Sequence, residues 1–112
     1  EYRDAMHSAI KYLDELKKYK IIWCESDFIA HALHDVLEMN NIKVGKDIHI
    51  IGYGDFETYT SNTEEPVLST ISADTEQIGI ALAEALIAEI NGNPVEKQIV
   101  NAKFIQRKTF TF

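Results

Sequence analysis

The sequence has 112 residues, of which 46% are hydrophobic and 26% charged, and its formal net charge is −7. This length suits one domain without room for a second, and the composition excludes a disordered chain. With 11 basic against 18 acidic residues, the chain is not expected to bind nucleic acid by itself, because that binding depends on Lys and Arg to neutralise phosphates.

The single cysteine, Cys24, excludes an internal disulfide framework. It lies in an apolar run, where cysteine behaves as a small hydrophobe, and this is compatible with a reducing cytoplasm. No apolar run approaches the roughly 18 residues that a membrane span requires, so no membrane partner is expected. Because the chain starts with Glu1 instead of Met, we expect it to be a fragment or a processed product.

The first part of the chain predicts a helix, a strand and a second helix. Apolar residues at helical spacing indicate a helix over residues 2–18. The run at 21–24 is short, apolar and partly β-branched, which favours a strand buried on both faces. Ser26-Asp27 can open the next helix, since either side chain can accept from the free N–H groups of a first turn. Asn40-Asn41 ends it, because Asn tolerates the left-handed conformation.

The middle of the chain predicts two further strands. Residues 43–47 indicate a surface turn, and a second buried strand follows over 48–53. A polar loop is expected over 56–65, and Pro66 then precedes a third strand over 67–71.

The last part predicts a long helix and a terminal strand region. Asp74 can cap a helix that runs to Asn91, where glycine and then proline stop it. The expected buried stripe of this helix consists of Ile78, Ala81, Leu82, Ala85, Leu86 and Ile90. Residues 97–112 alternate enough for one or two strands.

This alternation of helices and strands predicts an α/β fold with three layers, a mainly parallel sheet and flanking helices. In such sheets ligands bind beyond the carboxyl ends of the strands. Two strand ends carry polar groups on short turns, Glu25-Ser26-Asp27 and Gly54-Asp55. We therefore expect a binding site at these two turns.

Catalytic and metal-binding patterns are missing from the sequence. It has no Gly-rich phosphate loop, no Gly-x-Ser-x-Gly elbow and no Cys with an obvious His base. Asp55 follows a strand as in a phospho-accepting receiver domain, but the acidic cluster and lysine strand of such domains are not in place. His31 and His34 could share a helix face, yet neither Asp27 nor Asp35 is a convincing third ligand. We predict no enzyme, no metal site and no cofactor.

Four stretches occur in the order of a known family. Residues 22–30 (IWCESDFIA) lead from an apolar strand through Ser-Asp into an Ala-containing helix, and residues 44–55 (VGKDIHIIGYGD) end in a Gly-aromatic turn with an acidic residue. Residues 66–71 (PVLSTI) and 104–109 (FIQRKT) follow. Together they resemble the lactose/galactose-repressor (LacI/GalR) family of transcriptional regulators over nearly the whole chain.

The resemblance implies a two-lobed, periplasmic-binding-protein-like core that clamps an effector between its lobes. In this family an N-terminal helix-turn-helix binds operator DNA, and the repressor is commonly a dimer. Residues 1–112 would then be the C-terminal effector-binding and dimerisation lobe, without the DNA-binding domain and most of the N-terminal lobe. The helix over 74–91 would normally pack on the other lobe. We therefore expect exposed apolar surface, and association with a partner or with a second copy.

The family position of the first turn implies roles for its three residues. The residue at position 26 often bonds the effector, and the Ser26 hydroxyl can both donate and accept, while a helix cap is the equal alternative. Glu25 stands where a small residue is usual, so its carboxylate either reaches the cleft or is solvated. Asp27 is favoured as a cap and turn-former over an effector ligand.

The second turn departs from the family pattern. The family commonly places an effector-contacting Asp where this chain has Gly54, and Asp55 matches a second acidic position that tends to be structural. A charge-assisted hydrogen bond is worth roughly 1.5–3 kcal/mol. Either the effector is chemically different or the clamp has lost a bond, so a standard sugar is not assumed. Gly54→Asp is expected to leave effector affinity unchanged if the position is remote from the ligand.

Aromatic and histidine residues near the first turn have structural interpretations. Trp23 could stack on a sugar, but its place in an apolar strand run favours core packing. By family position, Phe28, His31, Ala32 and Asp35 resemble the helix face that meets the partner subunit. His31 would then make dimerisation respond to pH near neutrality.

The sequence thus predicts a cytoplasmic, dimerising, effector-sensing portion of a transcriptional repressor. The effector would be a sugar or sugar derivative that controls operator binding by population shift, through a DNA-binding segment outside this chain. The alternative is an extracytoplasmic sugar-binding protein of a transporter, which shares the fold. The ending at 107–109 and the turn at 52–55 favour the repressor.

Overall fold

The computed structural model describes residues 1–56 and 65–112. Most of the predicted loop over 56–65 therefore lies outside the described residues. The elements run in the order α1 (Tyr2–Lys11), α2 (Leu13–Leu16), β1 (Ile21–Trp23), α3 (Asp27–Met39), β2 (His49–Tyr53), β3 (Ser69–Ser72), α4 (Thr75–Ile90) and β4 (Lys103–Ile105).

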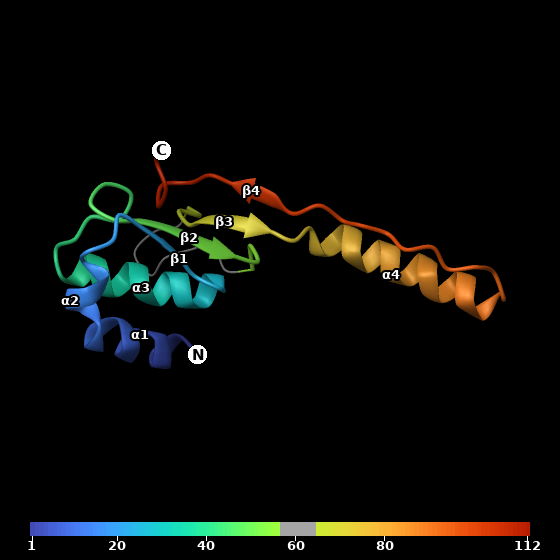
Figure 1. The fold of residues 1–112 in the computed structure, drawn as a ribbon, viewed down its shortest axis with the longest axis horizontal. Coiled ribbons are helices and arrows are strands. Elements are labelled where there is room, and N and C mark those ends of the chain that lie inside the picture. The colour runs from blue at the N-terminus through green and yellow to red at the C-terminus, as the bar shows by residue number, and fades with distance from the viewer. Residues whose placement is uncertain (57–64) are drawn as a thin grey trace.

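The four strands form one sheet in the order β1-β2-β3-β4. The first three strands are parallel and β4 is antiparallel to β3, which confirms the predicted α/β class with a mainly parallel sheet. α3 lies along one face of the sheet and α1 packs on α3 (Figure 1). Among the described residues no helix covers the opposite face, where the C-terminal segment runs, so the third predicted layer is not formed by these residues.

The core lies between α3 and the adjoining face of the sheet. Leu37 of α3, Ile50 of β2 and Leu68 beside β3 have no exposed surface and belong to one apolar cluster. Ala9 of α1 completes this cluster from the other side of α3. Burial of these side chains supplies the main driving force for folding of this part of the chain.

The helix ends follow the predicted capping signals. Ser26 is the N-cap of α3, and its hydroxyl accepts a hydrogen bond from the Ile29 N–H at 3.3 Å. Asn41 adopts a φ of 61° just after this helix. Asp74 is the N-cap of α4 and accepts from the Gln77 N–H at 3.3 Å. These local predictions are confirmed because capping depends on neighbouring residues only.

The predicted helix over 2–18 is wrong as a single element. Tyr12, with φ −105° and ψ 18°, leaves the helical conformation and separates α1 from α2. This break lets the shorter helix change direction, and both Leu13 and Leu16 pack against the core cluster.

β1 differs from its prediction because one face of this edge strand is exposed. Ile21 and Trp23 are both exposed, and the Trp23 side chain retains 62% of its accessible surface. Among the described residues nothing pairs with the outer edge of β1. The expectations of a strand buried on both faces and of a Trp23 core position are therefore wrong for this chain.

The largest departure from a compact shape is α4. It projects away from the sheet, and residues 91–102 run back beside it to β4 (Figure 1). No residue of the predicted buried stripe is buried: Ile78, Ala81 and Ala85 are half-buried, and Leu82, Leu86 and Ile90 are exposed, Leu86 by 61% and Ile90 by 73%. The radius of gyration is 17.7 Å, against about 13 Å for a compact chain of this length. We call residues 74–102 the arm and the remaining described residues the body.

Candidate functional site

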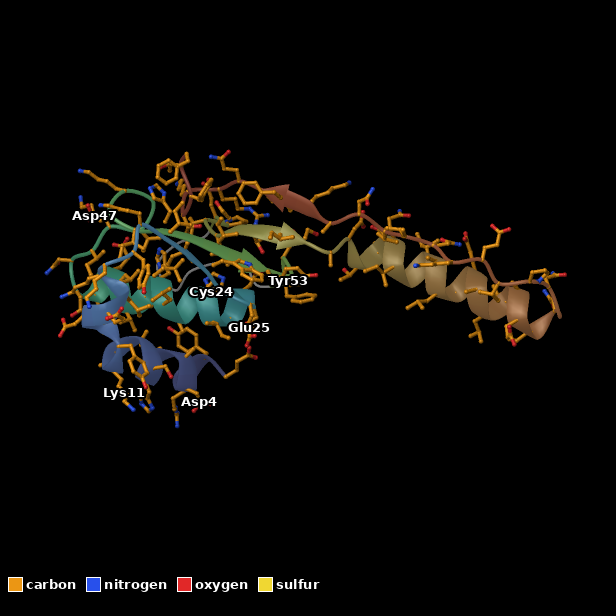
Figure 2. The ribbon with its side chains drawn as sticks, in the orientation of Figure 1. Asp4, Lys11, Cys24, Glu25, Asp47 and Tyr53 are labelled. Carbon is orange, nitrogen blue, oxygen red and sulfur yellow. The ribbon has the colours of Figure 1, made fainter. Side chains whose placement is uncertain are left out.

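The two predicted turns lie together at the carboxyl ends of β1 and β2, and we call this border of the sheet the edge. β1 and β2 are parallel neighbours, with Trp23 opposite Ile51, so both strands end on one side. Glu25 and Tyr53, close to these two strand ends, lie at the same end of the sheet in Figure 2. A hydrogen bond joins the turns directly, because the Phe56 N–H donates to Asp27 Oδ2 at 3.0 Å.

Asp27 connects three segments of the chain at this edge. Its side chain is fully buried, and Oδ1 accepts from the Thr70 hydroxyl at 2.6 Å while Oδ2 accepts from the Phe56 N–H. Thr70 is also fully buried. One carboxylate therefore joins the end of β1, the end of β2 and strand β3. The cap of α3 is Ser26, so the capping role predicted for Asp27 is wrong, while its role in forming the turn agrees with these bonds.

Sequence reasoning missed two residues of this network. A Cβ at Gly52 would lie 2.3 Å from Asp27 Oδ1 and 3.0 Å from Leu68 Cδ2, so only glycine leaves room for the buried carboxylate. Gly52 was visible as a glycine inside a strand, which often marks a close approach of this kind. Thr70 carries no comparable signal, since its partner lies 43 residues earlier.

Ser26 and Glu25 are the more accessible residues of the first turn. The Ser26 hydroxyl donates to Glu1 Oε1 at 2.9 Å and also caps α3. The cap interpretation is confirmed, and a role of Ser26 in effector binding stays a prediction. Glu25 is exposed, so its carboxylate is available to a ligand at this edge.

The space beside Gly54 is filled by an aromatic ring. Gly54 has φ 121°, and a Cβ there would lie 2.4 Å from Cδ2 and Cε2 of Phe56. A side chain at this position would therefore need a strained backbone and a displaced ring. Gly54→Asp is thus unsuitable as a test of ligand contact, because it is expected to disturb the turn whether or not the ligand lies nearby.

Asp55 is held inside the second turn by Arg107. The residue has φ 59°, and its Oδ1 accepts from the Arg107 guanidinium at 3.0 Å. The same nitrogen of Arg107 donates to the Leu68 carbonyl at 2.9 Å. Asp55 therefore has the structural contacts expected of the second acidic position, and a ligand contact through Asp55 stays a prediction.

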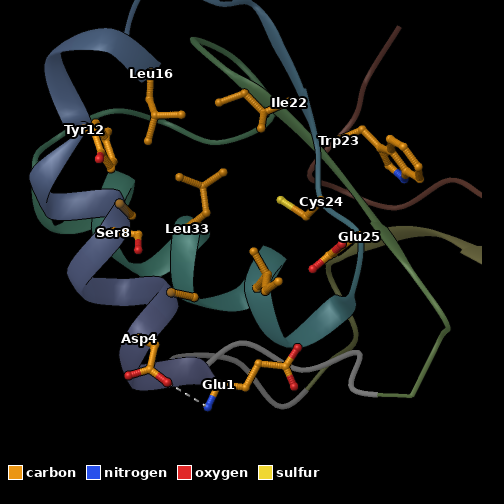
Figure 3. A pocket seen from close by; sticks show the side chains of 13 residues that line it. Glu1, Asp4, Ser8, Tyr12, Leu16, Ile22, Trp23, Cys24, Glu25 and Leu33 are labelled. Carbon is orange, nitrogen blue, oxygen red and sulfur yellow. Dashed lines mark ion pairs between the residues drawn. The ribbon is translucent and has the colours of Figure 1, made fainter.

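An open hollow of about 670 Å³ lies beside β1 and not over the two turns. Figure 3 shows Leu16, Ile22, Leu33 and Glu25 among the side chains that line it. Cys24 also faces it, and burial, together with the charge of Asp27, raises the pKa of the thiol to about 12. Among the residues that we assign to the two turns, only Glu25 borders this hollow.

The predicted dimer face on α3 is mostly covered by the chain itself. Ala32, His31 and Asp35 are buried, whereas Phe28 is exposed. The Tyr2 hydroxyl of α1 donates to Asp35 Oδ2. This hydrogen bond, with burial and the charge of Asp35, raises the pKa of Tyr2 to about 12. Because α1 packs on α3, Phe28 is the member of this face that retains surface for a partner.

Residues 1–56 and 65–112 also bear on metal binding and on membrane insertion. No group of three or more His, Cys, Asp and Glu side chains there could hold a metal ion. No helix there is long and apolar enough to cross a membrane.

Comparison with known proteins places these features in a family. The model of the periplasmic binding protein-like domain matches residues 4–110. The chain is 36% identical over 78 residues to the HTH-type transcriptional regulator RegA of Clostridium acetobutylicum, covering 68% of this chain and 23% of that protein. It spans between 23% and 33% of the length of the first curated relatives that it matches.

Two solved structures share the fold. The lac repressor dimer bound to operator and the anti-inducer ONPF superposes with a TM-score of 0.78 at 24% identity, over 95% of this chain and 37% of that one. A periplasmic binding protein/LacI transcriptional regulator from Alkaliphilus metalliredigens, complexed with D-xylulofuranose, gives a TM-score of 0.77 at 24% identity, over 96% and 41%. The chain belongs to the periplasmic binding protein-like domain family, in the form that occurs in LacI-family transcriptional regulators.

Proposed function

We propose that this chain senses a small-molecule effector at the edge formed by the turns after β1 and β2, and thereby controls DNA binding by its regulator. The observation that carries the proposal is the Asp27 carboxylate, which joins both turns and β3 in one buried network. Such a network holds polar groups in place at the carboxyl ends of parallel strands, where ligands bind in this class of sheet.

The proposed mechanism is a population shift. A ligand that contacts one arrangement of the two turns better than another favours that arrangement by its difference in affinity. β3 passes directly from this network into the arm, since Thr70 lies in β3 and Asp74 caps α4. A change at the edge therefore has a short covalent route to the arm.

The proposed effector is a sugar or a sugar derivative. Support comes from the Alkaliphilus metalliredigens structure of the same fold, which contains D-xylulofuranose. The exposed Glu25 and the Ser26 hydroxyl would supply hydrogen bonds to such a ligand.

We also propose a homodimer and an indirect link to DNA. The similar lac repressor structure is a dimer bound to operator. This chain carries a net charge of −7, so contact with operator phosphates is assigned to a segment other than these residues. Phe28 is the exposed residue proposed for the subunit contact on α3.

A thermal-shift screen of sugars, sugar phosphates and nucleobases on the intact protein tests the sensing role. A true effector raises the melting temperature in proportion to RT ln(1 + [L]/Kd). Glu25→Gln should reduce this ligand-induced rise, whereas Glu84→Gln, an exposed change in the arm, should leave it unchanged. Equal responses of the two variants to every stabilising compound would count against binding at this edge.

The exposed arm leads to a separate proposal about association. We propose that the apolar side chains of α4 are covered by a partner or by a second copy, because large apolar patches on soluble proteins mark contact sites. Sedimentation of the 112-residue chain at micromolar concentration should show association, and Leu86→Glu should weaken it. A purely monomeric chain would contradict coverage of α4 by a second copy.

A further inference from the structure

We propose that Phe56 determines ligand specificity at the end of β2, and that the ligand presents a planar, unsaturated ring with N–H donors to this edge. The inference rests on the proposed function and narrows it: among the sugars and sugar derivatives proposed above, it selects those that carry a planar, unsaturated ring. It concerns a residue two positions beyond the glycine that departs from the family pattern.

The backbone around Phe56 places its ring over Gly54. Gly54 has a left-handed φ of 121°. Two carbons of the Phe56 ring, Cδ2 and Cε2, lie 2.4 Å from the place that a Cβ at Gly54 would take. A carboxylate side chain at position 54 and the Phe56 ring therefore exclude each other in this conformation. The surface that a ligand meets here is aromatic instead of acidic.

The backbone of Phe56 is held in place by a hydrogen bond to a buried side chain of the body. Its N–H donates to Asp27 Oδ2 at 3.0 Å, and the other oxygen of this fully buried carboxylate accepts from Thr70 at 2.6 Å. Hydrogen bonds to a buried carboxylate are strong and directional, so the backbone of Phe56 is held in place before a ligand arrives.

The ring itself remains open to solvent. Phe56 exposes 64% of its surface, although its main chain is anchored to a buried group. In residues 1–56 and 65–112 no other aromatic ring stacks on it. An aromatic face that is both exposed and held in position is suited to stacking, which favours the flat face of an unsaturated ring.

The carboxylates at this edge narrow the ligand chemistry further. Both oxygens of Asp27 are used inside the chain, and Asp55 is paired with the Arg107 guanidinium at 3.0 Å. Glu25 is the exposed carboxylate of the two turns. Glu25 can therefore accept a hydrogen bond from an N–H donor of a ligand whose ring stacks on Phe56.

Titration of the ¹⁵N-labelled 112-residue chain, followed by NMR, tests this inference with three probes. Nicotinamide and indole are planar rings with N–H donors, and D-ribose is a saturated polyol of similar size. We expect millimolar nicotinamide or indole to shift the amide signals of Glu25, Gly54 and Phe56, while D-ribose shifts them much less.

Three variants test whether the Phe56 ring itself binds the planar probes. Phe56→Ala should weaken planar-probe binding roughly tenfold or more, as expected for loss of an aromatic stack. Phe56→Trp should restore it. Phe112→Ala removes another exposed phenylalanine, which packs near His49 at the opposite end of β2, and should change nothing.

Two results would overturn the inference. Tighter binding of D-ribose at these amides, unchanged in Phe56→Ala, would leave the proposed function intact but reject the planar ligand. A lack of any shift from the planar probes would also reject it. The thermal-shift screen does not depend on Phe56, so it judges the sensing role separately.

Discussion

The body and the arm contain helices of similar apolar content, yet they bury them very differently. α3 has most of its apolar face against the sheet and α1, whereas no residue of α4 is buried. Leu37 has no exposed surface and Leu86 in the arm is 61% exposed. A helix that is apolar all round is normally buried. The difference therefore lies in what the surrounding chain provides, because the sheet and α1 cover α3 while no described segment buries a residue of α4.

The largest expected effect comes from truncating one leucine in each region. Leu37→Ala should lower the free energy of unfolding by about 3 kcal/mol, because it leaves a cavity in the core. Leu86→Ala should change it by less than about 0.5 kcal/mol, because its side chain is already in water. Urea denaturation of the isolated chain measures both values. Equal losses would mean that the arm is covered after all.

Glycine substitutions should change the stability of the two regions in opposite directions. Gly52→Ala should cost about 2 kcal/mol, because the added Cβ would meet Asp27 Oδ1 at 2.3 Å. Gly79→Ala lies in α4 with nothing within 4 Å of the new atom, so it should stabilise the helix by about 0.5–1 kcal/mol. Helix content by circular dichroism and the unfolding midpoint check both variants. A neutral Gly52→Ala would contradict the tight fit around the carboxylate.

A hydroxyl deletion refines the picture of the body. Thr70→Val should destabilise the chain by about 1.5 kcal/mol, because it leaves Asp27 Oδ1 buried without its donor. Thr70→Ser keeps the donor and should cost less. In hydrogen exchange, Thr70→Val should speed exchange of the Phe56 amide more than that of the Ile50 amide, which donates to the Thr109 carbonyl at 2.8 Å. Uniform acceleration would indicate a general loss of stability only.

The smallest effect is expected for the contact between α1 and α3. The folded-state pKa of Tyr2 is about 12, above the ordinary value of 10.0. The hydrogen bond from Tyr2 to Asp35 thus stabilises the fold fully below pH 10 and loses its effect as the pH rises toward 12. The stability difference between the wild type and Tyr2→Phe should be constant from pH 7 to 9 and shrink above pH 10. A difference that stays constant to pH 12 would contradict this.

Local signals predicted both ends of α3 and the start of α4 correctly from the sequence. Ser26, Asn41 and Asp74 act through atoms within a few residues of themselves, so their roles are visible in a short window. The family pattern also led to the two turns that the sheet brings to one edge. The exposed Trp23 was not predicted, because the exposure of a strand side chain depends on which distant segments cover that face of the sheet.

The parts of the site that escaped prediction depend on distant contacts. The hydrogen bond from Thr70 to Asp27 spans 43 positions, and no pattern in either segment points to the other. Gly54 and Phe56 are only two residues apart, but the ring fills the place of the missing side chain only because of the φ of 121° at Gly54. Backbone conformation of that kind follows from the completed turn, not from residue type alone.

Hydrogen exchange of the intact protein, with and without the most stabilising compound of the thermal-shift screen, tests the central claim most directly. The claim is that the effector binds at the edge formed by the turns after β1 and β2. We expect bound ligand to slow exchange of the amides in residues 24–27 and 54–56. Slower exchange at residues 5–16, which border the hollow beside β1, without any change at the two turns would contradict it.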